Sequence, residues 1–382
     1  MALRLRVRRK THIVTPVRFA RAITGLPNAL DPDPDDRGFA MSTRPEFWGV
    51  TDARGAMIGI TAGQTVEMRV LREDIDGGAP VFITVTPADL IEVAAPASGG
   101  PLTGSDTFQI KGLKDEPNKC AKVQARLGDA KGPVLGELEC HIFALKELHI
   151  VAHFVTIRGV PATLGLGSVS LDALKKVAEE DIRTVNAIYR PAGIQFELRD
   201  ARIDSIDDVP ETGKPFKVPG KVSFVIEEPD VSFKEVKAIM ALNSAAHAIN
   251  VYYVHRIFGG NNGFAARRGT IFAKDNPPGV VISDHSRLMG ADRTLAHELG
   301  HYLQLPHPDQ SEKVFVTKVD MWMLRRLMQH AALTPGHPPH HDDVGYGSSV
   351  RGTGITLKDF GLDTRDSECA ILRKEARLEL GR

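Results

Sequence analysis

The hydrophobic pattern of the chain changes near residue 147, and this change limits the folds open to it. Before that point, short segments rich in β-branched residues follow one another, separated by turn sequences such as DGGAP, ASGGP and GDAKGP. Short strands at such regular spacing are typical of a β-sandwich. We therefore expect a β-rich, sandwich-like accessory domain over residues 1–146. The segments expected to form its strands are FWGVTD, AMIGITAGQTVEMRV, VFITVTPADLIEV, CAKVQARLG and GPVLGELECHIF, and the N-terminal MALRLRVRRKTHIV also alternates as a strand does.

From residue 147 onward, strands alternate with helices. ELHIVAHFVTI predicts a strand, and Ser170 is placed to cap the helix that follows it. Pro191 and Gly193 are expected to end this helix, and the alternating IQFEL predicts the next strand. This order favours an α/β domain with a mixed sheet over residues 147–382, so that the whole chain is of the α+β class. The face of the helix expected to be buried comprises Leu171, Leu174, Ala178, Ile182 and Val185.

A second helix and further strands follow in the same half of the chain. Ser232 and Glu235 form a capping-box pattern, which predicts that the helix FKEVKAIMALNSAAH begins there. The segments KVSFVIEE, INVYYVHRIF, GTIFA and GVVIS are predicted strands, and the glycine-rich GGNNGFAARRG is expected to separate the second from the third. Asp292 is placed to cap one more helix.

Composition excludes several classes of function. The 48 lysines and arginines balance 48 aspartates and glutamates, so we expect no nucleic-acid partner bound through its phosphates. No apolar run reaches the about 18 residues that a membrane-spanning helix needs. The basic N-terminus lacks the apolar core of a secretory signal, so the expected location is cytoplasmic, with signal-independent export as the alternative.

The stretch AHELGHYLQLPH, residues 296–307, has the spacing of a zinc site. His297 and His301 are four residues apart, so on a helix both imidazoles project from one face and can reach one ion. Glu298 lies beside the first histidine, where its carboxylate can approach an activated water without being a ligand. Pro306 disfavours further helix, and a chain that turns there can bring His307 to the same ion. The alternative is a helix whose histidines only satisfy hydrogen bonds in the core.

With these residues the chain resembles the metzincin clan of zinc metallopeptidases, whose motif is HExxHxxGxxH. The resemblance covers roughly residues 147–382 and includes the order strand, helix, strand, strand, edge strand, strand and active-site helix. It implies one zinc ion per chain held by His297, His301 and His307, with Glu298 as the catalytic general base. It further implies hydrolysis of peptide bonds in a protein or peptide substrate by a zinc-bound water. The proline after His307 is similar to that of serralysins.

Further residues enter through the same resemblance. Met328, in RRLMQH, is the candidate for the methionine turn beneath the metal, unless VDMWMLRRLM is simply an apolar helix face. Thr270, Ile271, Phe272 and Ala273 are the candidate edge strand for pairing with an extended substrate. Gln304 departs from the clan, because it stands where the family glycine ends the helix with a positive φ. A glutamine there either adopts that conformation, at a cost of roughly 1–2 kcal/mol that zinc binding can offset, or the turn takes another path.

Other ligand sets and another function stay open. Asp309, Glu368 or Glu375 can replace His307 as the third ligand, and the loop from His337 to Asp343 can bind a second metal or simply be solvated. The competing function is a non-catalytic binding or structural protein, for example of a secretion or phage-like assembly, whose zinc only stabilises the fold. A carboxylate at Glu298 favours the enzyme, because a purely structural site has no use for a base there.

Overall fold

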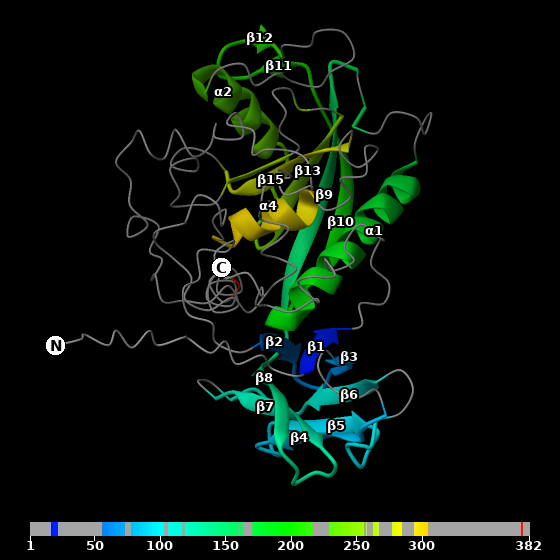
Figure 1. Cartoon of the computed structure of the whole chain (residues 1–382). Coiled ribbons are helices and arrows are strands. Elements are labelled where there is room, and N and C mark those ends of the chain that lie inside the picture. The colour runs from blue at the N-terminus through cyan, green and yellow to red at the C-terminus, as the bar shows by residue number, and fades with distance from the viewer. Residues whose placement is uncertain are drawn as a thin grey trace, which may run out of the picture.

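The computed structural model describes residues 17–21, 56–72, 78–102, 106–116, 119–159, 161–162, 170–216, 229–255, 257, 263–266, 277–284, 294–304 and 376. Within these ranges the protein is a mixed α+β structure, mostly strands, with three α-helices (Figure 1). The helices are α1 Leu171–Tyr189, α2 Pro229–Met240 and α4 Thr294–Tyr302, and a short 3-10 turn, η3, spans Arg190–Ala192. The strands are β1 Val17–Arg21, β2 Ala56–Thr61, β3 Thr65–Arg72, β4 Val81–Thr86, β5 Ile91–Ala95, β6 Thr107–Gly112, β7 Ala121–Leu127, β8 Val134–Phe143, β9 Lys146–Ile157, β10 Ile194–Ile206, β11 Asp208–Val209, β12 Lys214–Pro215, β13 Ile249–Val254, β14 Gly263–Ala266 and β15 Gly279–Ser283.

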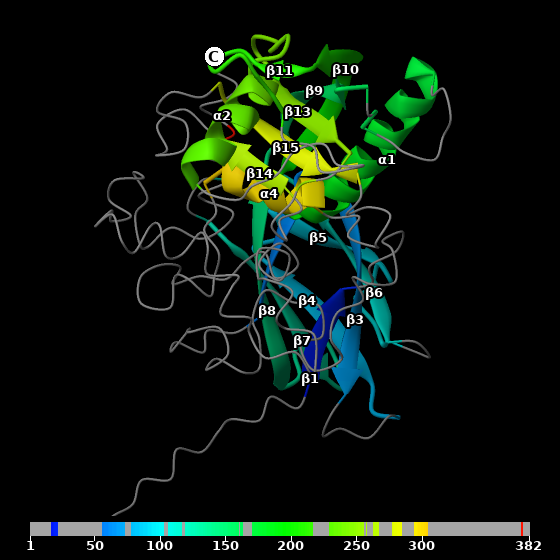
Figure 2. The same ribbon diagram turned by 90° about the horizontal axis from the view of Figure 1, so that it is seen from above.

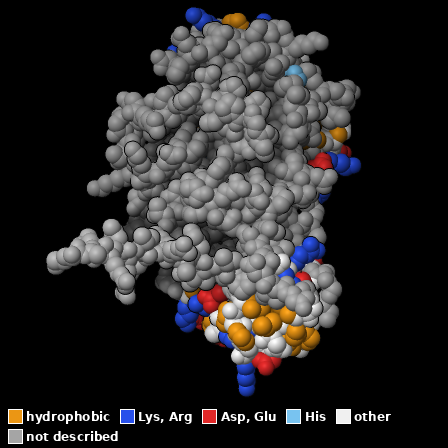
Figure 3. Space-filling model, in the orientation of Figure 1, with side chains coloured by type: hydrophobic (Ala, Val, Ile, Leu, Met, Phe, Trp, Pro, Cys, Tyr) orange, Lys and Arg blue, Asp and Glu red, His pale blue; other side chains and the backbone are white. Residues whose placement is uncertain are grey.

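The first eight strands form two four-stranded sheets that share one hydrophobic core. Their orders are β1-β3-β6-β5 and β2-β8-β7-β4. Along β6 every second residue is buried, as expected of a strand with one face on a core. The side chains of Met68, Phe108, Val123 and Leu138, drawn from both sheets, meet in this core. Hydrophobic side chains also gather on the surface at the outer end of these sheets, with charged side chains beside them (Figure 3).

Two of the segments expected to be β-rich are each divided between the sheets. AMIGITAGQTVEMRV forms β2 and β3, and the turn between them contains Gly63 with a φ of 81°. VFITVTPADLIEV forms β4 and β5, divided at Pro87, which cannot donate a ladder hydrogen bond. The strand character of both segments is confirmed, and a tight turn inside each one sends its second half to the other sheet. β1 and β6 were not predicted at all, and both FWGVTD and the N-terminal MALRLRVRRKTHIV lie outside the described residues.

The second half of the chain builds one five-stranded mixed sheet in the order β10-β9-β13-β15-β14. All neighbouring strands are parallel except β14, which runs antiparallel to β15 at the edge. β13 and β15 are buried at every position, because the sheet is covered on both faces. α1 and α4 contribute to the core on one face and α2 to the core on the other. Figure 2 likewise places α1 and α2 on opposite sides of β9 and β13.

The beginning and end of α1 follow the sequence signals. The hydroxyl of Ser170 accepts a hydrogen bond from the backbone N–H of Ala173, which confirms the predicted N-cap. The helix ends at Tyr189, and Gly193 closes the following turn with a φ of 66°. The predicted buried face is confirmed except at Leu171, which is 44% exposed. Leu171 is the first residue of the helix, and the core covers the helix only from Leu174 onward.

The expected limits of α2 were wrong at both ends. The helix begins at Pro229, so Ser232 lies inside it and is not its cap. A proline with its fixed φ suits the first turn of a helix, whose N–H groups have no helical partner. The helix ends at Met240, seven residues before the expected end. Asn243 and His247 have φ values of 43° and 60°, which no α-helix contains.

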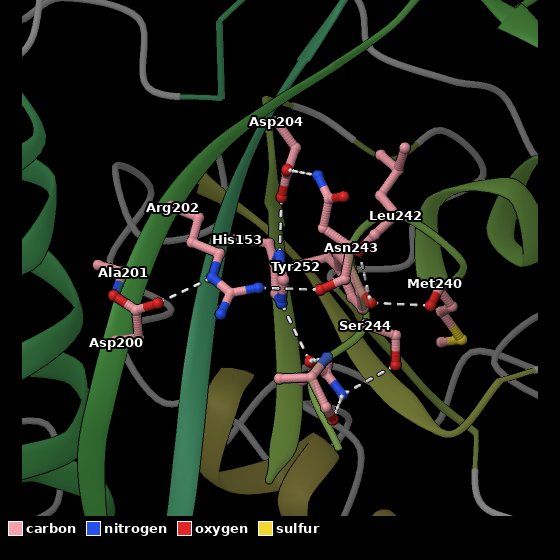
Figure 4. A network of polar contacts seen from close by, with 12 residues as sticks. His153, Asp200, Ala201, Arg202, Asp204, Met240, Leu242, Asn243, Ser244 and Tyr252 are labelled. Carbon is pink, nitrogen blue, oxygen red and sulfur yellow. Dashed lines mark hydrogen bonds and ion pairs between the residues drawn. The ribbon is translucent and has the colours of Figure 1, made fainter.

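A buried polar network holds the segment between α2 and β13 in this shape (Figure 4). The Nδ1 atom of His153 lies 2.7 Å from a carboxylate oxygen of Asp204, and its Nε2 atom lies 3.0 Å from the side-chain oxygen of Asn250. Asn243 donates its amide N–H to the other oxygen of Asp204. Asn250 accepts from the backbone N–H of Ala245 and donates to the carbonyl of the same residue. Because each of these groups has several partners, the network fixes a turn that sequence periodicity alone predicts as helix.

Replacing Asp204 with alanine is expected to lower the free energy of unfolding by about 2–4 kcal/mol, because the buried imidazole of His153 loses its acceptor and the amide of Asn243 loses its partner. Asp200→Ala is the matched control on the same strand. Asp200 pairs with Arg202 at the surface, and such pairs contribute at most about 1 kcal/mol. Chemical denaturation of both variants measures the difference, and equal losses would contradict the structural role given to Asp204.

The same carboxylate should make stability depend on pH. Burial alone would raise the pKa of Asp204, but hydrogen bonds from His153 and Asn243 outweigh it and leave the pKa below its usual value. A group with a lowered folded-state pKa contributes stability above its unfolded pKa, and this contribution is lost as the pH falls toward the folded pKa. We therefore expect the wild type to lose stability below about pH 4 more steeply than Asp204→Ala.

Candidate metal centre

α4 carries the histidine motif and is anchored by its apolar residues. Leu295, Leu299, Tyr302 and Leu303 are all buried in the core between the sheet and α1. They recur at spacings of three and four residues, so they form one stripe along the helix. α4 also packs against β14 and β15 (Figure 2). The burial of this stripe sets the rotation of the helix and thereby the direction of its histidines.

The structure brings His297 and His301 together. Their Nε2 atoms lie 3.1 Å apart, and the ring planes are perpendicular with centroids 4.7 Å apart. Two nitrogen ligands of one tetrahedral zinc, each at about 2.0–2.1 Å, lie roughly 3.3 Å apart. Both imidazoles are partly exposed, so an ion can approach them from solvent. This pair therefore fits two of the ligand positions of a zinc ion.

Glu298 lies next to the first histidine but faces another way. Its side chain is only 6% exposed, and burial raises the pKa of its carboxyl group to about 8. A positive charge close by would favour the carboxylate and lower this pKa. The side chain lies against the backbone of Gly263 on β14, where an added Cβ would stand 2.6 Å from its Cγ atom. Glu298 is thus held between the helix and the edge strand.

Gln304 ends the helix in the conformation expected of the family glycine. Its φ is 71°, and its backbone N–H donates to the carbonyl of His301 over 2.9 Å. The N–H of Leu303 still donates to the carbonyl of Leu299 in helical fashion, so the change of direction falls at Gln304. Of the two alternatives at Gln304, the structure shows the left-handed turn, which costs a residue with a Cβ roughly 1–2 kcal/mol. The chain therefore leaves the helix three residues after the second histidine, at Gln304.

Tyr189 is a residue of this region that sequence reasoning missed. It is fully buried at the end of α1, and its hydroxyl donates to the carbonyl of Ala296 over 2.7 Å. Burial, with the nearby Glu298, raises the pKa of this phenol well above its usual value, so it stays a donor. Ala296 directly precedes His297, so the bond ties the end of α1 to the turn of α4 that carries His297. The available signal was its place on the apolar stripe of α1, since a buried tyrosine hydroxyl needs a partner.

The antiparallel edge strand of the sheet is β14, within the segment GGNNGFAARRG. That segment was expected only to separate strands, so this expectation was wrong at Gly263–Ala266. These residues form a strand because they pair with β15 and pack against α4. A glycine-rich composition does not predict either contact. The predicted edge-strand residues Thr270, Ile271, Phe272 and Ala273 lie outside the described residues.

Several other predicted residues also lie outside the described part of the chain. Among the described residues, no three His, Cys, Asp or Glu side chains are grouped as a metal site requires. His307 lies outside the described residues. The roles given to the following residues stay predictions: His307, Met328, Asp309, Glu368, Glu375, the cap Asp292 and the loop from His337 to Asp343.

Comparison with known proteins gives no relative: no protein-family model matches the chain, and no curated protein matches it significantly. No helix among the described residues is both long and apolar enough to cross a membrane.

Proposed function

We propose that this protein is a zinc-dependent endopeptidase whose metal is held by His297, His301 and His307. The observation that carries the proposal is the convergence of two Nε2 atoms 3.1 Å apart on one helix, with a buried carboxyl group between them in sequence. Histidines that serve only the core would be expected to point toward separate partners. The alternative of a metal that merely stabilises the fold does not account for a buried glutamate at this place.

The arrangement of the sheet supports the same proposal. The order β9, α1, β10, β13, β14, β15 and α4, with β14 as an antiparallel edge, follows the order that the metzincin resemblance implies, apart from β11, β12 and α2, which the chain adds between β10 and β13. We include in the proposal a metzincin-like domain over residues 147–382 and a sandwich-like accessory domain over residues 1–146. The boundary between them stays a prediction.

The residues of this chain would divide the chemistry as follows. A zinc ion supplies a Lewis acid that polarises the scissile carbonyl and makes water a better nucleophile at neutral pH. Glu298 takes the proton from the attacking water and later delivers it to the leaving amine. Tyr189 holds the turn that carries His297, and Met328 would pack beneath the site.

An extended peptide is the substrate that best fits an edge strand, since it can add to the sheet by backbone hydrogen bonds. We therefore propose that protein or peptide substrates bind in extended form along the edge of the sheet near α4. β14 supplies this edge in the described part of the chain, and Thr270–Ala273 remain candidates for its continuation. Unfolded proteins and flexible loops are the expected substrates.

The test is hydrolysis of fluorescently labelled unfolded casein by the purified chain loaded with zinc. Cleavage should stop when a chelator removes the metal and return when zinc is restored. Cleavage that persists after complete removal of the metal would contradict the proposal.

A further inference from the structure

Gly263 lies so close to Glu298 that no side chain would fit at position 263 without a shift. A Cβ built on Gly263 would lie 2.6 Å from Cγ, 2.9 Å from Cδ and 2.8 Å from Oε1 of Glu298. These three atoms of Glu298 are the nearest neighbours of that position. Real Cβ atoms essentially never approach other heavy atoms so closely, so either residue would have to shift.

The strand geometry explains why this glycine meets the glutamate. Gly263 pairs with Ile282 of β15, so the position of its backbone is fixed by the sheet. Phe264 and Ala266 point into the core on the α2 side, and successive residues of a strand face opposite ways. Position 263 therefore faces α4, as does Ala265, which packs against the core on that side.

We propose that Gly263 is a positioning residue for Glu298: the missing side chain lets the edge strand lie directly on the glutamate and fix the position of its carboxyl group. This inference rests on the proposed function, because it assigns a role in the same reaction. The contact also excludes water from one side of Glu298, consistent with its 6% exposure.

A methyl group at position 263 should act on the site more than on the fold. The atoms that it meets are the outer part of a flexible side chain, which can rotate away, whereas the strand is held by its neighbour. A misplacement of about 1 Å in a catalytic group can lower a rate about a hundredfold. Gly263→Ala should therefore lower kcat by about tenfold to a hundredfold while KM and the zinc content stay unchanged.

Gly279→Ala is the matched control. Gly279 lies at the other end of the same strand pair, opposite Ala266, and a Cβ there would stand 3.1 Å from the backbone oxygen of Asn250. This variant introduces the same methyl group under steric pressure but far from Glu298. It should lose some thermal stability and keep its kcat at a temperature where it is folded.

A second test measures thermal stability and does not require that the protein be an active enzyme. Gly263→Ala should lower the unfolding midpoint by about 2–4 °C in the wild type, because the methyl group meets Glu298. In the Glu298→Ala background the three atoms are gone, so the same change should leave the midpoint unchanged or raise it. Equal shifts of the unfolding midpoint in the wild-type and Glu298→Ala backgrounds would overturn the inference. A Gly263→Ala variant that keeps the kcat of the wild type, or that loses zinc, would also overturn it. If the wild type cleaves nothing, the proposed function fails, and this double-mutant cycle still decides whether the two residues are coupled.

Discussion

Glu298→Gln is expected to lower kcat/KM for peptide hydrolysis about a thousandfold while zinc stays bound. Glutamine has nearly the same shape as glutamate and fits the space against Gly263, so the helix and its histidines should not move. Its amide, however, cannot accept the proton of the attacking water. General acid–base catalysis contributes about 10²–10⁴-fold in enzymes, which sets the size of the loss.

Glu235→Gln is the matched control for this variant. Glu235 is also a buried glutamate, 3% exposed, but it lies on α2, which covers the opposite face of the sheet. The control should keep its activity at temperatures where it is folded. Full activity in Glu298→Gln, with zinc bound, would remove Glu298 from the mechanism and leave the metal without its expected base.

His301→Ala is expected to weaken zinc binding about 10²–10³-fold and to abolish hydrolysis with it. Apparent binding free energies of about 10–16 kcal/mol for four-ligand zinc sites correspond to roughly 3–4 kcal/mol for each ligand. Because its Nε2 atom lies 3.1 Å from that of His297, the loss should be nearly the same in His297→Ala. Competition with a chromogenic chelator measures both affinities.

His149→Ala is the control for the loss of a histidine as such. His149 lies on β9 near the exposed Glu197, with its Nδ1 atom 3.4 Å from that carboxylate. This variant should bind zinc as tightly as the wild type. Unchanged zinc affinity in both His297→Ala and His301→Ala would mean that the metal binds elsewhere in the chain.

The local signals in the sequence predicted those parts of the fold that local chemistry controls. The capping serine at Ser170 and the glycine turn at Gly193 depend on a few neighbouring residues, and both are confirmed. At Gln304 the sequence left two paths open, and the structure shows the left-handed one. The facing pair His297 and His301 also follows from helix geometry alone, since residues four apart share a face.

Features that depend on distant contacts could not be predicted in this way. The turns between β2 and β3 and between β4 and β5 depend on the pairing of the two strands on either side of each turn with different sheets. The early end of α2 depends on Asp204, which is 39 residues from Asn243 in the chain. Likewise the contact of Gly263 with Glu298 arises only when the edge strand is laid on α4.

Elemental analysis of zinc per chain, on wild type and His307→Ala purified side by side, tests the central claim most directly. A three-histidine centre predicts one zinc in the wild type and a clear loss in the variant. Zinc retained by His307→Ala would contradict that ligand set and direct attention to Asp309, Glu368 or Glu375. A wild type that holds no zinc, even after reconstitution, would contradict the account as a whole.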